Sequence, residues 1–430
     1  MLCIGIMTGN SLDAVDAVLT HFEHDKITDI CTHSTPYPQQ LRADFLTLKA
    51  YLSAGMDMKT FCKTQLFQQT HDTYIQLVAN TVLELIQQNG IEKSTIQAIG
   101  FHGQTIDYCG PSVAKKSGIK PYNTQMGSGQ MLSNLTGLPV IYDFRSDDVM
   151  TGGEGAPLAP THNLNLARTL NIESAIFFNA GNTSNLSIVA DNQVLGWDAG
   201  PFNELTDKMM QLHKNKPFDE NGTYGLKGQL NPDLLNKLFE YSATTGGGEN
   251  YLTLPPPKAS DPRWYRFLDE LKDPTNFNDK LHTVQYFAAY TAAYTLKFVP
   301  STIQMPTNFI LFGGGWNNPV CRMTFENILN GTSFILPHHT TDFKEILSRF
   351  ESTPQIWISN MGKYMEARIF ADLAHYYLKN RPWFENVAGH TPIRLGRMRY
   401  PNESVINDMI SRSSKGWQEE LLFNTTTKVE

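Results

Sequence analysis

The sequence predicts an α/β protein with a duplicated architecture, in which each half of the chain contributes its own sheet. Two stretches, 2–34 and 174–197, both contain strand-like runs joined by turns that are rich in glycine and asparagine. In both halves these runs are followed by longer segments of helical period. The length of 430 residues suggests two domains or one large two-lobed unit.

The first half opens with a hairpin pattern, because the turn formers Gly9 to Asp13 join two apolar runs. A long helical period follows, and Asn89-Gly90 ends it as a C-cap signal. A later strand leads directly into His102. The predicted strands lie at 2–8, 14–22, 27–34, 95–101 and 138–142, and the helices at 61–88 and 130–135.

The second half repeats this order, with a strand, a glycine turn and a second hairpin. Its strands are predicted at 174–179, 186–190, 193–197 and 308–312, and its helices at 204–213, 279–298 and 364–378. A modest amphipathic helix is also expected after Pro401. The expected domains are a first lobe at 1–130, a second lobe at 131–384 with an insertion near 214–273, and a C-terminal segment at 385–430 that returns to the first lobe.

Composition limits the possible functions. Hydrophobic residues make up 41% of the chain and charged residues 18%, which allows a full core. The net charge is −7 and no basic run occurs, so nucleic-acid binding is not expected. The five cysteines are scattered, as is typical of reduced thiols in the cytoplasm. We find neither a signal peptide pattern nor an apolar run of membrane-spanning length.

The segment 143–160, DFRSDDVMTGGEGAPLAP, is the most informative stretch. Arg145 offers planar donors to a carboxylate or phosphate, and the following glycines let the backbone approach a ligand closely. This combination at a strand end predicts a ligand site. The alternative is a polar loop with one structural ion pair.

Three further glycine turns follow predicted strands, and each offers backbone donors to phosphate or nucleotide. The first includes the Ser11 hydroxyl. Ordinary tight turns are the alternative for all three, which are GNSLDAVD (9–16), NAGNTSN (179–185) and GGGWNN (313–318).

Three titratable side chains are candidates for chemistry. Asp198, in GWDAGP, follows an apolar strand and is a candidate general base; the alternative is an N-cap. Glu366 has apolar helical neighbours, so we expect it to be buried and paired, or else to lie on the helix surface. His102 could hold a substrate hydroxyl or be a satisfied core histidine.

Taken in order, these segments resemble the anhydro-N-acetylmuramic acid kinase family. The resemblance covers most of the chain apart from the insertion and the C-terminal tail, and its long central block is the most specific part. The matching stretches are GIMTGNSLDAVDAVL (5–19), GFHGQTI (100–106), LTGLPVIYDFRSDDVMTGGEGAPLAP (135–160), NAGNTSN (179–185), GWDAGP (196–201), GGGWNNP (313–319) and MEARIFADLA (365–374).

The resemblance implies the two-lobed, ribonuclease H-like fold of actin-like ATPases and sugar kinases, with ATP in a cleft between the lobes. It implies that ATP and water convert 1,6-anhydro-N-acetylmuramic acid to N-acetylmuramic acid 6-phosphate and ADP, during cell-wall sugar recycling in a bacterial cytoplasm. Mg²⁺ is implied as a cofactor and a homodimer as the assembly, with no nucleic-acid or membrane partner.

The resemblance also implies roles for individual residues. Asp198 would be the base that activates water. The substrate would be bound by Arg145, Glu366, His102, Gly153, Ala156 and Pro157. The nucleotide would be bound by Gly9, Asn10, Ser11, Asp13, Asp16, Gly181, Asn182, Gly313, Gly314 and Gly315. No metal ligand is assigned.

The chain departs from the family pattern at several positions. Asn10 and Ala14 stand where Thr and Gly are usual, Asn182 replaces a glycine, Ser128 replaces an acidic residue, and Asp107-Tyr108 replaces a histidine. These changes concern nucleotide affinity and sugar fit more than the chemical step. They leave open a related sugar kinase with another substrate, or an inactive nucleotide- or muropeptide-binding sensor.

Overall fold

The computed structural model describes residues 1–24, 26–111, 114, 118–241, 250–259, 276–359, 362–387, 390–404 and 408–415. The chain divides into two compact units. The first comprises Met1–Leu158, Tyr364–Glu385 and the segment from His390 onward, and the second comprises Ala159–Lys363 and Asn386–Gly389.

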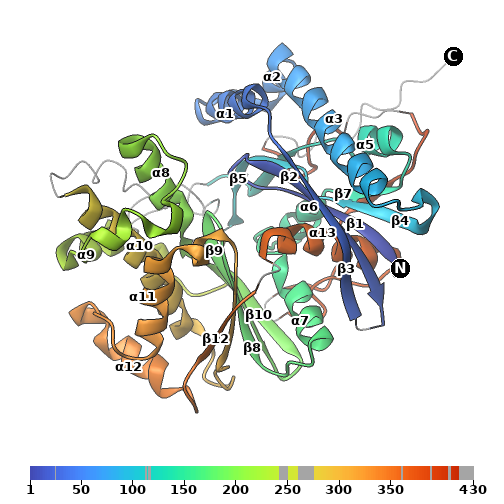
Figure 1. Cartoon of the computed structure of the whole chain (residues 1–430). Helices are drawn as coiled ribbons and strands as arrows, with labels where there is room; N and C mark the ends of the chain where they lie inside the picture. The colour runs from blue at the N-terminus through green and yellow to red at the C-terminus, as the bar shows by residue number, and fades with distance from the viewer. Residues whose placement is uncertain are drawn as a thin grey trace. The chain divides into compact units, whose positions relative to one another are not determined.

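The first unit contains a six-stranded mixed sheet in the order β13-β7-β4-β1-β2-β3. Strands β1, β2, β3, β4 and β7 of this sheet are labelled in Figure 1. Strands β1, β2 and β3 are antiparallel, whereas β1, β4 and β7 run parallel. The bounds are β1 Leu2–Thr8, β2 Ala14–Glu23, β3 Lys26–Pro36, β4 Ile96–Phe101, β7 Val140–Tyr142 and β13 Arg397–Arg399, with β5 Gln104–Cys109 and β6 Tyr122–Met126 in a separate pair.

The helices of the first unit cover this sheet. Helix α13 packs against β1, β2 and β4, and its backbone comes so close that a Cβ at Gly5 or Gly100 would overlap the carbonyls of Ala367 or Phe370. Helix α3 packs against β2 and β3, and Thr64 caps its N-terminus. The helices are α1 Gln39–Ser53, α2 Met58–Phe61, α3 Gln65–Gln88, α5 Gly129–Thr136, α6 Phe144–Met150 and α13 Met365–Leu378.

The second unit contains a five-stranded sheet in the order β10-β9-β8-β11-β12. Strands β8, β9 and β10 are antiparallel, whereas β8, β11 and β12 run parallel. This is the order of the first sheet without β13, so the predicted duplication is confirmed. The strands are β8 Ala175–Ala180, β9 Thr183–Ala190, β10 Gln193–Pro201, β11 Asn308–Phe312 and β12 Gln355–Ile358.

The second unit's helices pack around α10, whose faces are buried almost throughout. This helix contacts α8, α9, α11 and β10, while α7 contacts β9 and β10. The helices are α7 Ala159–Thr169, α8 Asn203–Lys214, α9 Pro232–Tyr241, α10 Phe277–Tyr294, α11 Pro319–Leu329 and α12 Thr340–Ser348. Within the described ranges no helix is both long enough and apolar enough to cross a lipid bilayer.

Short 3₁₀ segments join several of these elements. They lie at Lys93–Thr95, Glu220–Gly222, Gly225–Lys227, Tyr251–Thr253, Thr295–Phe298, Gly314–Asn317, Pro337–His339 and Gly362–Tyr364.

Several expectations differ from this architecture. The division between units falls after Leu158, not near 130, because β7 extends the first sheet and α13 covers it. Residues 131–158 and 364–384, expected in the second lobe, therefore belong to the first unit. Helices α1 and α6 were not expected. The insertion near 214–273 contains α9, which packs on α10; its residues 242–249 and 260–273 lie outside the described ranges.

No helix occurs in residues 402–404 and 408–415, and the rest of the segment after Pro401, where a helix is expected, lies outside the described ranges. In residues 408–415 the side chains of Asp408 and Ser411 bond to residues 123–130 of the first unit.

Candidate active site

In the first unit, polar residues gather where the parallel strands β1, β4 and β7 end. Thr8 is the last residue of β1, His102 follows β4 and Asp143 follows β7. The Thr8 hydroxyl donates to the Gly103 carbonyl at 2.9 Å, and the His102 amide donates to the Ile6 carbonyl. The carboxyl ends of parallel strands are where open α/β sheets bind ligands.

Arg145 is fixed by two hydrogen bonds on this edge. Its Nε donates to His102 Nε2 at 3.0 Å, and its Nη1 donates to the Gly155 carbonyl at 2.6 Å. His102 must therefore be the neutral tautomer with its proton on Nδ1. Burial, and then the Arg145 charge, hold the pKa of His102 well below its usual value.

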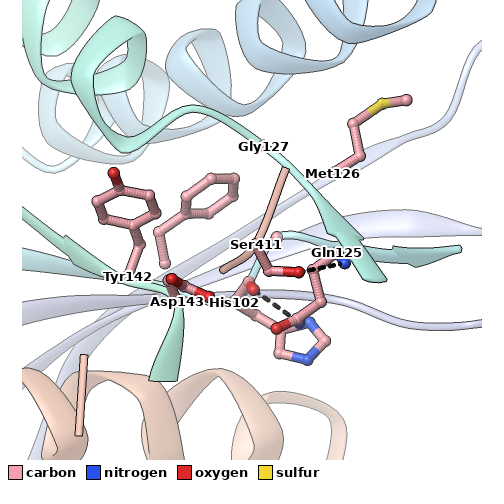
Figure 2. A pocket seen from close by; sticks show the side chains of 9 residues that line it. His102, Gln125, Met126, Gly127, Tyr142, Asp143 and Ser411 are labelled. Carbon is pink, nitrogen blue, oxygen red and sulfur yellow. Dashed lines mark hydrogen bonds between the residues drawn. The ribbon is translucent and has the colours of Figure 1, made fainter. Parts of the chain in front are cut away.

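A pocket of about one water molecule's size lies beside this pair. Figure 2 shows His102, Gln125, Asp143 and Ser411 around it. Gln125 Nε2 donates to the His102 carbonyl at 2.9 Å, and the Gln125 amide donates to the Ser411 hydroxyl at 2.9 Å. The pocket is too small for a sugar.

The glycine segment after α6 folds back onto that helix. The Gly155 amide donates to Asp148 Oδ2 at 2.7 Å, and a Cβ at Gly153 would overlap the Asp148 carboxylate. Glycine at 153 is therefore needed for close packing. Ala156 and Pro157 follow, Pro157 buried and Ala156 half-buried. Sequence reasoning missed Asp148 as the anchor of this loop.

The loop between β1 and β2 is a hairpin turn, as predicted. Asn10, Ser11 and Asp13 are exposed, and the Ser11 hydroxyl donates to Asp13 Oδ1 at 2.7 Å. Asp16 lies within β2, opposite Met7. Gln104, which sequence reasoning did not single out, donates from Nε2 to the Gly9 carbonyl at 3.1 Å and so links this turn to the segment after His102.

Glu366 lies in the first turn of α13 and is exposed, so of the two alternatives the position on the helix surface is confirmed and the buried position was wrong. Its neighbours Ala367 and Ile369 are buried, and the Ala367 carbonyl lies against Gly5 of β1. An α-helix turns by 3.6 residues, so one position in an otherwise apolar stretch can still point outward.

In the second unit, one row of paired residues crosses the end of the sheet. Asp198 in β10 pairs with Asn185 in β9, which pairs with Asn179 in β8, which pairs with Phe312 in β11. This row brings Asp198 to the sheet end that carries the glycine turns after β8 and β11. Asp198 lies inside β10 rather than after it.

Asp198 is only 8% exposed, and its backbone is held on both sides. Its amide donates to the Lys258 carbonyl at 3.2 Å, and the Tyr251 hydroxyl donates to its carbonyl at 2.9 Å. The β10–β9 pairing shifts register between Asp198 and Gly200. Bulges of this kind re-aim side chains next to active sites.

Tyr251 and Lys258 belong to the insertion near 214–273, to which the sequence analysis assigned no role. Lys258 is buried, and its Nζ donates to the Tyr251 carbonyl at 3.1 Å. Burial, then the charge of Lys297, lowers the pKa of Lys258 to about 7, although Asp198 acts in the opposite direction. In the sequence, Lys258 is marked only by the preceding prolines 255–257. These prolines do not indicate that its carbonyl contacts Asp198.

The glycines after β11 lie against the turn after β8. Gly313 has φ +93°, and a Cβ there would come within 2.5 Å of Asn179 Oδ1 and 2.6 Å of the Ala180 carbonyl. Gly314 faces open space, whereas Gly315 packs against Phe202. The carbonyls of Gly181 and Asn182 accept from the first residues of α8.

The structure brings some of the predicted residues together in each unit. In the first, the structure joins His102, Arg145 and the loop at 153–157, and Gln104 ties the 9–13 turn to the same segment. In the second, it gathers Asp198, the 181–182 turn and the 313–315 turn. Among the described side chains no group of three or more His, Cys, Asp or Glu could hold a metal ion.

The same sheet order in both units, with polar turns at the carboxyl ends of the central strands, defines the class of actin-like ATPases and sugar kinases. Residues 1–396 match the sequence profile of the anhydro-N-acetylmuramic acid kinase family. The chain belongs to this family.

Curated relatives agree with this assignment. An anhydro-N-acetylmuramic acid kinase from Vibrio vulnificus is 29% identical over 384 residues, covering 89% of this chain and 93% of the relative. The enzyme of the same name from Nitrosomonas europaea is 34% identical, covering 77% of this chain and 85% of the relative.

Solved structures include more distant neighbours. Component A of (R)-2-hydroxyglutaryl-CoA dehydratase from Acidaminococcus fermentans has a TM-score of 0.42 at 10% identity, covering 86% of this chain and 96% of its own. The ROK hexokinase from Thermus thermophilus has a TM-score of 0.40 at 14% identity, covering 88% of this chain and all of its own.

Proposed function

We propose that this protein is an ATP-dependent anhydro-N-acetylmuramic acid kinase. It opens the 1,6-anhydro ring with water and transfers the γ-phosphoryl group of ATP to O6, giving N-acetylmuramic acid 6-phosphate and ADP. The observation that carries the proposal is the family match over 1–396, together with the presence of Asp198 in that match.

The reaction needs one base. Water loses a proton to Asp198 and its oxygen bonds to the anomeric carbon, while the bond from that carbon to O6 breaks. The O6 electron pair attacks the γ-phosphorus in line and ADP leaves. Because the phosphoryl group replaces the proton that O6 would otherwise need, no second carboxylic acid is required.

Different polar groups bind the sugar and the nucleotide. Arg145 holds the sugar's carboxylate or the transferring phosphoryl group, and neutral His102, Glu366 and the segment Gly153, Ala156 and Pro157 hold the sugar. ATP is bound through backbone donors and bare backbone of the segment from Gly9 to Asp16, of Gly181 with Asn182, and of Gly313 to Gly315. The open space over Gly314 supports this last role.

Magnesium would arrive with the nucleotide. When bound, it supplies charge neutralisation at the phosphates. Mg²⁺ commonly binds through substrate phosphates, water and one or two carboxylates. We assign no carboxylate ligand.

We further propose a homodimer in the cytoplasm that acts on small molecules, without nucleic-acid or membrane partners. The net charge of −7 opposes phosphate-backbone binding. The five cysteines are all free, as suits a reducing compartment.

A coupled ADP-release assay tests the proposed reaction. We expect ADP release with 1,6-anhydro-N-acetylmuramic acid and not with glucose, mannose or N-acetylglucosamine. Release only with ordinary hexoses would replace the proposed substrate, and release with none of these sugars would contradict kinase activity.

A further inference from the structure

The C-terminal clasp, which we define as residues 408–415, lies beyond the part of the chain that matches the family. The match ends at residue 396, yet the clasp is built into the first unit and Ser411 lines the pocket beside His102. Asp408, Ser411, Ser413 and Ser414 are all nearly or fully buried. A buried polar segment of this kind must have its hydrogen bonds satisfied by defined partners.

The clasp runs along β6 and bonds to it repeatedly. The Gly127 amide donates to the Met409 carbonyl at 2.9 Å, and the Ser411 amide donates to the Gln125 carbonyl at 3.0 Å. The Asn123 amide then donates to the Ser413 carbonyl at 3.0 Å. These bonds fix the register of the clasp against a strand whose Gln125 also holds the His102 carbonyl.

At its start, the clasp brings a buried carboxylate to the N-terminus of α5. Asp408 accepts hydrogen bonds from the Ser128 hydroxyl, from the Gln130 amide at 3.1 Å and from the Tyr142 hydroxyl at 2.6 Å. The first turn of a helix favours a negative charge. This end of the clasp is therefore anchored independently of α6.

At its other end, the clasp holds α6. Arg412 Nε pairs with Asp143 Oδ2 at 2.6 Å and its Nη2 with Asp147 Oδ1 at 2.9 Å, so one guanidinium bridges the residue before the helix and its first turn. Ser413 donates from its amide to the Ser146 hydroxyl at 3.0 Å, and the two hydroxyls lie 2.9 Å apart. Arg397, 3.4 Å from Asp143, is the second cation at this carboxylate.

These contacts matter because α6 cannot fix its own orientation. It has seven residues and no side-chain N-cap, and Asp143 before it has φ +61°. Helices this short are marginal without tertiary contacts. Asp143 is 4% exposed, so its charge needs a partner. Arg145 is the second residue of α6, so it can reach His102 and Gly155 only if the helix keeps this orientation.

We propose that Arg412 and Ser413 are positioning residues that hold α6, and through it Arg145, in the geometry needed to bind the substrate. This inference rests on the proposed function for its kinetic consequence. A displacement of about 1 Å at a reacting group can cost about 100-fold in rate. Loss of the clasp contacts should therefore weaken binding of the anhydro sugar and leave ATP binding largely unchanged.

The test compares Arg412→Ala, Arg412→Lys and Ser413→Ala with the full-length wild type. Arg322→Ala is the matched control, because the ion pair that Arg322 makes with Glu326 on α11, at 4.0 Å, is about 40% exposed and lies in the second unit. For Arg412→Ala we expect the KM for the anhydro sugar to rise between about 10- and 100-fold while the KM for ATP changes less than about twofold. Arg412→Lys should restore part of the loss, because it keeps the charge without the fork.

Hydrogen exchange of the amides at 144–150 provides a second readout that does not require activity. We expect faster exchange there in Arg412→Ala and Ser413→Ala than in the control. If Arg412→Ala does not fold, Ser413→Ala tests the inference instead, because it removes the Ser413 hydroxyl that lies against Ser146 of α6. Wild-type kinetics and exchange in these variants, matching Arg322→Ala, would overturn the inference. If wild type releases no ADP with the anhydro sugar, the proposed function fails, whereas exchange at 144–150 still decides whether the clasp holds α6.

Discussion

At the residue scale, Arg145 is the side chain whose role depends most on its shape. Its Nε and Nη1 donate in two directions, to His102 Nε2 and to the Gly155 carbonyl. Lysine has the charge but not this geometry. We expect Arg145→Lys and Arg145→Ala both to lower kcat/KM for the anhydro sugar by about 10²–10³-fold. Initial-rate kinetics measure this, and an unchanged kcat/KM would remove Arg145 from the site.

His102 should make the free energy of unfolding depend on pH. Its pKa is lowered in the folded state by burial and then by Arg145, so below about pH 6.5 the unfolded chain binds a proton that the folded chain does not. The stability contribution of neutral His102 is full above about pH 6.5 and is lost as pH falls below it. Urea unfolding at several pH values should show a slope that His102→Gln reduces by up to about 1.4 kcal/mol per pH unit. Equal slopes in the two proteins would show that His102 titrates normally.

At the element scale, the sequence predicted strands better than the short helices at their ends. The hairpins and the strands at β4, β8 and β11 follow from apolar runs and turn residues, which are local signals. Helix α6 was missed because its sequence FRSDDVM has no apolar period and is held by Arg412 and Ser413, more than 260 residues away. The sequence left the position of Glu366 open between buried and exposed, because apolar neighbours do not fix the direction of one side chain.

The turn after β11 gives the element-scale prediction. Gly313→Ala introduces a Cβ at φ +93° against the backbone of Ala180, so we expect a loss of about 1–3 kcal/mol in unfolding free energy. Gly314→Ala points into open space and should leave stability within about 0.5 kcal/mol of wild type. If bare backbone at 314 meets the nucleotide, the same variant raises the KM for ATP. Denaturant unfolding and ATP kinetics on the matched pair check both expectations, and a stable Gly313→Ala protein would contradict the first.

At the scale of the whole molecule, the two large sheets share one strand order apart from β13, and each unit carries its own group of polar residues. The duplication was visible in the sequence because hairpins and glycine turns recur in both halves. The division after Leu158 was not visible, since it depends on β7 pairing with β4 and on α13 returning to the first sheet. Likewise, Tyr251 and Lys258 were invisible as supports of Asp198, because their contacts join residues about 50 or more positions apart.

Substitution of Asp198 by Asn tests the central claim most directly, with single-turnover ADP release and calorimetric binding of the anhydro sugar measured on the same protein. The amide keeps the size of the side chain but cannot accept the proton from water. We expect turnover to fall by about 10²–10⁴-fold while the Kd for the sugar stays within about threefold of wild type. Wild-type turnover in the Asp198→Asn protein would show that this carboxylate does not activate water.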